Sequence, residues 1–204
     1  MTRYALEILQ QPMRARMCGF GDKDRRLVGP LPILRLKEFD DEESSNTSKS
    51  DTSGLVVHAD LWSVDFNQDC NVVTNPASIP TTPTNDQHGS SVMSLAGPVN
   101  VRNLIGSTIS SAYQLKHING EPGIFFLFPD LSVRVEGTFR LKFSLWDLMS
   151  VWRGGQNSML THVFSEPFTV YQPRSFPGMT EVTPLSNWFS KQGMKLSLRR
   201  PGEH

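Results

Sequence analysis

The strongest constraint on the fold is a strict alternation of apolar and polar residues in several short segments. In FRLKFSLW (139–146) every second residue from Phe139 to Leu145 is apolar, and the residues between them are polar. Successive side chains of a strand point to opposite faces, so this pattern predicts a strand with one buried face. YALEI (4–8), LVVHADL (55–61) and LSVRVEG (131–137) repeat it. The pattern is typical of an antiparallel sheet that packs on one side.

Further strands are predicted for PILRLK (32–37), GIFFLFPD (123–130), VFSEPFTVY (163–171) and KLSLR (195–199). About eight short strands separated by Gly, Pro, Asn and Asp favour a mainly β, immunoglobulin-like antiparallel sandwich over a doubly wound fold. Helix is scarce. TPLSNWFSKQG (183–193) predicts one, with Thr183 as its cap, Pro184 at the first position and Gly193 at its end. VNVRNLIG (99–106) is a weaker second candidate.

The charge of the chain is balanced in total but segregated along the sequence. Twenty Lys and Arg residues stand against twenty Asp and Glu residues. Cations concentrate in 14–26 and in the tail 191–200, and acidic residues concentrate in 38–43. Two cysteines are too few for a disulfide framework, which favours a reducing compartment. No apolar run approaches the roughly 20 residues that span a bilayer, so we expect no membrane association.

Enzyme and metal motifs are missing from the sequence. It contains no P-loop, no G-x-S-x-G elbow and no H-E-x-x-H. Gly19-Phe20-Gly21 lacks the third glycine of a dinucleotide-binding loop, and the five histidines are scattered away from Cys18 and Cys70. We therefore expect a non-enzymatic protein with no catalytic residues, no cofactor and no metal.

RARMCGFGDKDRR (14–26) is the segment most suited to binding a ligand. It combines five cations with glycines that allow a close approach of the backbone. Guanidinium groups bind phosphates and guanine edges in bidentate fashion, so the segment suits nucleic acid. A solvated polar turn after the first strand explains the same charges. The charges alone do not distinguish this interpretation from a nucleic-acid-binding loop.

Three long blocks resemble the fungal velvet domain, in its VelB-like branch: QQPMRARMCGFGDKDRRLVGPLPILRLK (10–37), GIFFLFPDLSVRVEGTFRLKFSL (123–145) and VFSEPFTVYQPRSFPGMTEVTPLSNWFSKQGMKLSLRR (163–200). The resemblance implies a fold like the Rel homology region. Residues 66–94 would be a short version of the branch's variable insertion. Residues 38–54 and 74–94 are polar and would not repay the entropy lost on ordering. We therefore expect a single domain over 1–204 with flexible loops at 38–54 and 66–94.

The resemblance also assigns residues. Arg14 and Arg16 resemble the DNA-reading motif of Rel-type factors, with Cys18 as a less close match, and 23–26 carries the family's basic cluster. The family's proline-rich turn reads GPLP here, which predicts a looser turn at Gly29. The tail cations would add phosphate contacts. The expected DNA-binding residues are Arg14, Arg16, Lys23, Arg25 and Arg26, with additional phosphate contacts from Lys195, Arg199 and Arg200.

The implied function is a sequence-specific DNA-binding regulator of fungal development and secondary metabolism. Its expected partners are double-stranded DNA, itself or another velvet protein as a dimer, and a methyltransferase-like regulator. Its expected location is the nucleus, reached by shuttling from the cytoplasm. The alternative is an interaction subunit that completes another velvet protein or recruits a chromatin modifier without binding DNA. Core packing is expected for Phe128, Leu131, Phe139 and Phe143, and an interface role for Trp146, Trp152 and Trp188.

Overall fold

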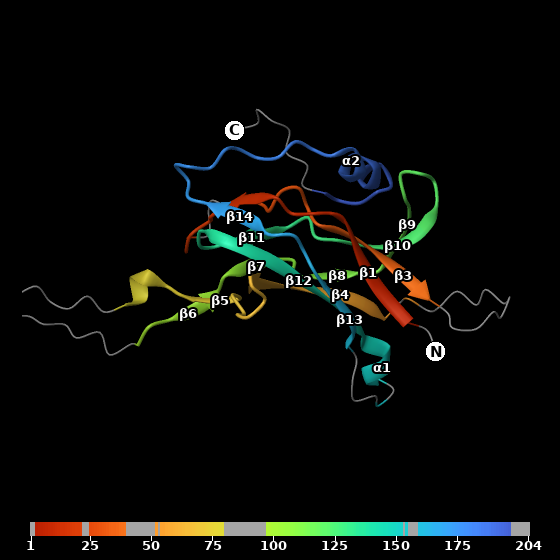
Figure 1. Ribbon diagram of the computed structural model, residues 1–204, viewed down its shortest axis with the longest axis horizontal. Coiled ribbons are helices and arrows are strands. Elements are labelled where there is room, and N and C mark those ends of the chain that lie inside the picture. Colours follow the sequence, from red (N-terminus) through yellow and green to blue (C-terminus); the bar gives the residue numbers. More distant parts are fainter. Residues whose placement is uncertain are drawn as a thin grey trace, which may run out of the picture.

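Two β-sheets face each other and enclose the main core (Figure 1). The computed structural model describes residues 3–21, 25–39, 52, 54–79, 97–152, 154 and 159–196 of the chain. The first sheet has the order β1-β3-β10-β9, with bounds β1 Arg3–Gln10, β3 Ile33–Phe39, β10 Pro122–Leu127 and β9 Tyr113–Lys116. The sandwich architecture predicted from the alternating segments is thereby confirmed.

The second sheet has the order β2-β14-β12-β4-β8, and β13 pairs with the remaining length of β12. The bounds are β2 Arg14–Arg16, β14 Phe168–Tyr171, β12 Gly137–Asp147, β4 Leu55–Ser63, β8 Ile109–Ser111 and β13 Met159–Phe164. β2 and β14 run parallel, whereas β12 is antiparallel to β4, β13 and β14. Two small pairs complete the strands: β5 (Val72–Thr74) with β6 (Asn100–Arg102), and β7 (Leu104–Gly106) with β11 (Leu131–Val133).

The alternating segments form the core between the sheets. On β12 the apolar positions from Phe139 to Leu145 are buried, and they pack on the alternate apolar positions of β4, from Leu55 to Leu61. Full burial of each such side chain contributes roughly 1.5–3 kcal/mol, so this strand pair forms the centre of the fold. The predicted core roles of Phe128 and Leu131 are also confirmed, since both are buried in the same cluster.

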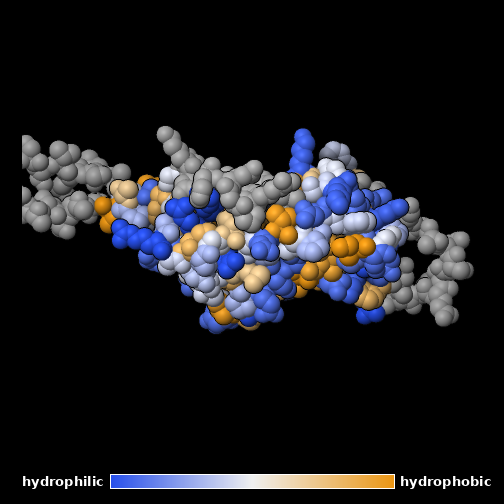
Figure 2. Space-filling model, turned by 90° about the horizontal axis from the view of Figure 1, so that it is seen from above, coloured by the Kyte–Doolittle hydropathy of each residue, from blue (hydrophilic) through white to orange (hydrophobic). Residues whose placement is uncertain are grey.

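A second apolar cluster lies on the outer face of the four-stranded sheet, beneath α2 (Pro184–Lys191). Phe125 and Leu127 of β10 point into this cluster, whereas Phe126 points into the main core. This double burial explains why GIFFLF is a continuous apolar run. Seen from the α2 side, the described surface is mostly hydrophilic with small separate apolar patches (Figure 2).

The predicted helix is confirmed with its caps. The Thr183 hydroxyl accepts a hydrogen bond from the Ser186 amide at 3.1 Å, and Pro184 occupies the first position. Gly193 follows the helix with φ +91°, a conformation that favours glycine. The structure adds a 3-10 turn, η1 (Pro76–Ser78), and a short helix, α1 (Leu148–Trp152), that the sequence did not predict.

Two secondary-structure predictions were wrong. VNVRNLIG is not helical: it forms β6 and β7, because these residues pair with β5 and β11. VFSEPFTVY is not one strand, because it breaks at Ser165, whose hydroxyl accepts a hydrogen bond from the Leu141 amide at 2.9 Å. The predicted strand KLSLR lies mostly outside the described residues; of its described part, Lys195 and Leu196 form no strand, and Leu196 packs on the cluster beneath α2.

The two predicted loops fall partly outside the described residues. In 38–54 the structure describes the end of β3, Thr52 and Gly54. In 66–94 it describes β5 and η1 as far as Ile79, and residues 80–94 lie outside the described part.

Candidate nucleic-acid interface

β2 directs two of the predicted arginines away from the core. Ala15 is fully buried in the main cluster, and because strand side chains alternate, Arg14 and Arg16 point to the opposite face. β14 holds the strand through the pairs Thr169–Arg14 and Tyr171–Arg16. Both arginines are half-buried, so their stems lie along the protein while they remain within reach of a ligand.

The turn after the basic segment is closely held rather than loose. The Gly29 carbonyl accepts hydrogen bonds from the amides of Met13 and Arg14, both at 3.0 Å, and the Gly29 amide donates to the Arg14 carbonyl at 2.9 Å. A Cβ on Gly29 would lie 2.6 Å from the Thr180 hydroxyl, so glycine permits a close approach of the 179–183 segment. The expectation that Gly29 loosens this turn is therefore wrong.

Arg25 is partly committed inside the protein. Its Nη2 donates to the Asp130 carboxylate at 2.9 Å, and its side chain is 34% exposed. Gly106 makes room for this pair: its φ is +106°, and a Cβ there would lie 1.6 Å from the Asp130 carbonyl oxygen and 2.8 Å from Arg25 Nη2. The ion pair fixes the position of Arg25 and leaves part of its guanidinium accessible.

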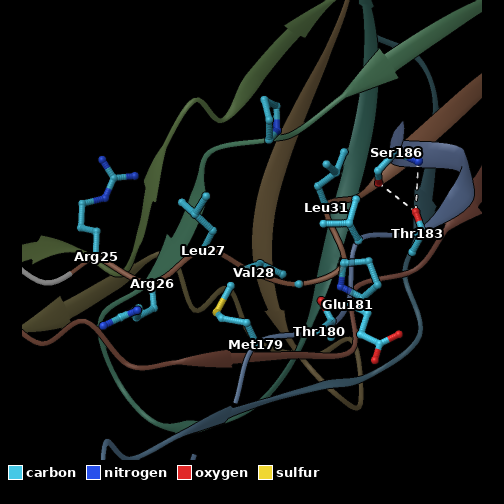
Figure 3. A pocket seen from close by; sticks show the side chains of 14 residues that line it. Arg25, Arg26, Leu27, Val28, Leu31, Met179, Thr180, Glu181, Thr183 and Ser186 are labelled. Carbon is cyan, nitrogen blue, oxygen red and sulfur yellow. Dashed lines mark hydrogen bonds between the residues drawn. The ribbon is translucent and has the colours of Figure 1, made fainter. Parts of the chain in front are cut away.

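A pocket of about 60 Å³ adjoins these residues (Figure 3). Arg25 and Arg26 lie at one end, and Thr183 and Ser186 lie at the other, joined by hydrogen bonds. The two guanidinium groups point in different directions. A pocket of this size holds only a few waters, so the arginines are better suited to an extended ligand outside it.

The fold brings further arginines to the same part of the molecule. Arg134 follows β11 and contacts the segment after β2, and Arg102 ends β6 beside it. Arg174 lies in the turn after β14, whose Tyr171 carbonyl accepts a hydrogen bond from the Met17 amide at 2.8 Å. The arginine cluster defined in this way consists of Arg14, Arg16, Arg25, Arg26, Arg102, Arg134 and Arg174.

The sequence prediction missed the last three members of the arginine cluster. Each stands alone among uncharged or acidic neighbours in the sequence, so no local pattern marks it. Contacts between distant segments, and not a local pattern, place them in this part of the molecule.

The remaining predicted residues have different outcomes. Lys195 is exposed after α2, where its neighbours Met194 and Leu196 pack on the four-stranded sheet, so the structure does not bring it to β2. Lys23, Arg199 and Arg200 lie outside the described residues. Trp188 has a structural role, because its indole Nε1 donates to the Lys116 carbonyl at 2.7 Å. Trp152 is 87% exposed.

Within the described ranges, no group of three or more His, Cys, Asp or Glu side chains is arranged to hold a metal ion. None of the described helices is long and apolar enough to cross a membrane. Cys18 and Cys70 form no disulfide, and partial burial together with Asp69 and Asp65 raises the pKa of the Cys70 thiol.

Known proteins similar to this chain share most of its length. It is 32% identical to a velvet complex protein of Emericella nidulans over 290 residues, covering 98% of this chain and 79% of that protein. That alignment exceeds the length of this chain, so the relative carries segments with no counterpart here. The chain is 35% identical to "Sexual development regulator umv3" of Mycosarcoma maydis, covering 96% of this chain and 45% of that protein.

A family model described as "Velvet factor" matches residues 4–203, which includes both sheets, both helices and the arginine cluster. "Velvet complex subunit 2" of Gibberella moniliformis is 32% identical, covering 97% of this chain and 61% of that protein. The chain therefore belongs to the velvet factor family.

Proposed function

We propose that this protein is a velvet regulator that binds double-stranded DNA through the arginine cluster. The observation that carries the proposal is the gathering of these arginines, from five separate segments, at one part of a neutral protein. Segregated positive charge attracts the phosphate backbone even when the total charge is zero. Family membership supports a regulatory rather than an enzymatic role.

Within this proposal the arginines have two tasks. Arg14 and Arg16, held on β2, reach the DNA from a fixed strand, and the 23–26 segment enters a groove. Guanidinium groups on phosphates position the protein, and those on guanine edges select sequence. The Arg25–Asp130 pair orders the end of the loop before DNA arrives, which lowers the entropy lost on binding.

We also propose that the protein acts as a dimer with itself or another velvet protein, in the nucleus, in the control of development and secondary metabolism. Relatives are named velvet complex subunits and a sexual development regulator, which supports association and a developmental role. A dimer would set the spacing of two DNA half-sites. A methyltransferase-like regulator is a further proposed partner.

The second candidate is an interaction subunit that does not itself bind DNA. Exposed apolar side chains on α1 and the start of β13 favour it, with Trp152 87% and Leu148 52% exposed. Light scattering of the purified chain, alone and with duplex DNA, separates the candidates. A DNA-dependent increase in mass supports the first, and a mass that changes only with an added velvet protein supports the second.

The DNA site is tested by changing Lys23, Arg25 and Arg26 together to Ala. We expect weaker binding to a duplex that the parent protein selects from a random library. The slope of log affinity against log salt should fall by about one unit for each phosphate that the variant no longer neutralises. Lys37→Gln, a single neutralisation on β3 that breaks only the exposed pair with Glu7, is the control.

Because Arg25 pairs with Asp130, the triple variant could also be less stable, so its thermal unfolding is measured beside its DNA affinity. Asp130→Asn removes that ion pair while keeping every cation, so it separates an effect on stability from an effect on DNA binding. If the triple variant binds the duplex as tightly as the parent protein at every salt concentration, the site assignment is wrong.

A further inference from the structure

Arg134 joins the segment after β2 to the β5–β6 ribbon. Its Nη1 donates to the Gly19 carbonyl at 2.9 Å, and its Nε donates to the Arg102 carbonyl at 2.8 Å. One planar guanidinium therefore spans two segments that are more than eighty residues apart in the chain. The rigid fork geometry of arginine suits this bridging, and lysine, with a single ammonium, cannot reproduce it.

Main-chain hydrogen bonds around Arg134 also hold the junction between the segment after β2 and the β5–β6 ribbon. The Gly19 amide donates to the Arg134 carbonyl at 3.0 Å, so both backbone polar groups of Gly19 are bound to Arg134. The φ of Gly19 is +65°, which favours glycine at this contact. The Arg134 amide donates to the carbonyl of Asn103, which is only 1% exposed and whose Nδ2 donates to the Cys70 carbonyl. The junction is thus anchored in a buried polar network.

Arg102 is the cation that this junction presents to solvent. It ends β6, where Asn100 and Arg102 are exposed and Val101 between them is half-buried. Its carbonyl is used by Arg134, while its side chain forms no ion pair or hydrogen bond with any residue in the described ranges. An exposed guanidinium next to the Gly19 segment is available for a phosphate.

We infer that the DNA-binding surface continues from the segment after β2 onto the β5–β6 ribbon. In this inference Arg102 contacts a backbone phosphate, and Arg134 is a positioning residue that sets the basic segment relative to Arg102. The inference rests on the proposed function and deepens it, because it gives two members of the arginine cluster separate roles at the ribbon: Arg102 contacts DNA and Arg134 positions the basic segment. We assign this contact to the phosphate backbone of DNA because the backbone presents a row of negative charges to cations from separate segments.

The phosphate contact is tested with Arg102→Gln against the matched control Lys37→Gln. Both remove one exposed charge, but Lys37 lies in the second half of β3, at the far end of the molecule from β6 (Figure 1). We expect Arg102→Gln to lower the salt slope by about one unit for selected and scrambled duplexes alike. Lys37→Gln should leave the slope unchanged. Equal effects of the two variants would mean that only net charge matters, which overturns the inference.

The positioning role is tested with Arg134→Lys, which keeps the charge and loses the fork. We expect about a tenfold lower ratio of affinities for selected over scrambled duplex, because the basic segment loses its place while the charge remains. Arg102→Gln should leave that ratio unchanged. An unchanged ratio in a folded Arg134→Lys variant overturns the positioning role. If this variant does not fold, Arg102→Gln still decides whether the ribbon contacts DNA.

The two proposals fail in different ways. If the parent protein binds no duplex, both are overturned. If the Lys23, Arg25 and Arg26 variant loses binding while Arg102→Gln keeps the parental slope, the extension onto the ribbon alone is overturned. If Arg102→Gln alters binding to a velvet partner and not to DNA, the ribbon is a protein contact and the inference is wrong.

Discussion

The two outer faces of the sandwich are closed in different ways. On the four-stranded sheet a helix covers the apolar side chains, and Phe125, beneath α2, has no exposed surface. On the six-stranded sheet the covering is made by long cations. The Lys142 ammonium lies 4.8 Å from the centre of the Trp62 ring, and the Arg140 guanidinium lies 4.7 Å from the centre of the Phe66 ring.

The difference shows two solutions to the same problem of exposed apolar area. α2 removes its side chains from water completely, which requires tight packing and polar groups satisfied at the helix start. Lys142 and Arg140 lay their apolar stems over aromatic rings and keep their charges in water. Loss of side-chain volume should therefore destabilise the protein strongly on the helix-covered face and only weakly on the cation-covered face.

The largest effect is expected from Phe189→Ala. Phe189 is fully buried between α2 and β10, with its ring centre 4.9 Å from that of Phe125. Loss of the ring leaves a cavity and should lower the free energy of unfolding by about 3–5 kcal/mol, measured by urea denaturation. Trp152→Ala is the control, because that side chain is 87% exposed and its change should stay within about 0.5 kcal/mol. Equal losses would show that α2 does not seal this face.

A smaller effect is expected from Gln10→Ala, in the buried polar contact between β1 and the start of α2. The Gln10 amide donates to the Leu31 carbonyl at 2.7 Å and to the Ser186 hydroxyl at 2.9 Å, and its oxygen accepts from the Thr183 hydroxyl at 2.5 Å. Removing it takes one partner from the Leu31 carbonyl and leaves the Thr183 and Ser186 hydroxyls bonded only to each other and to the helix start. The cost should be about 1–3 kcal/mol by thermal unfolding. Gln192→Ala, at the exposed end of α2, should cost less. A larger loss of stability from Gln192→Ala than from Gln10→Ala would contradict the importance of this buried contact.

The smallest effect is expected from Lys142→Met on the cation-covered face. Methionine keeps the apolar stem and removes the charge that lies over the Trp62 ring. The free energy of unfolding should fall by about 0.5–1 kcal/mol, which is the scale of an exposed cation–π contact. A double-mutant cycle with Trp62→Leu isolates the contact, since the two losses should not add. Fully additive losses would mean that Lys142 does not stabilise this face through the ring.

Local patterns allowed much of the fold to be predicted. Alternation identified β1, β4 and β12 because one face of each meets a core and the other is more exposed. It also identified β11, although all three residues of that strand are buried. Local hydrogen-bonding chemistry located α2, since Thr183 and Gly193 act on residues within one turn. The basic segment could be recognised as a candidate site because its charges are adjacent in the sequence.

Other features depend on distant partners and leave little local pattern. β2 is a three-residue strand that exists through its pairing with β14, and VNVRNLIG was misread because its strands pair with β5 and β11. GIFFLFPD could be predicted as a strand, but its burial on both faces follows from the position of α2.

The sequence by itself thus determined the longer alternating strands, the caps of α2 and the basic segment, because these depend on neighbours within a few residues. The tertiary structure decided which arginines from distant segments lie near β2 and the segment that follows it. Arg102 and Arg134 lie beside Gly19 only because β11 and the ribbon deliver them there, and Lys195 lies elsewhere because its neighbours pack with α2. Hydrogen bonds and burial between remote segments set these positions, and no local pattern encodes them.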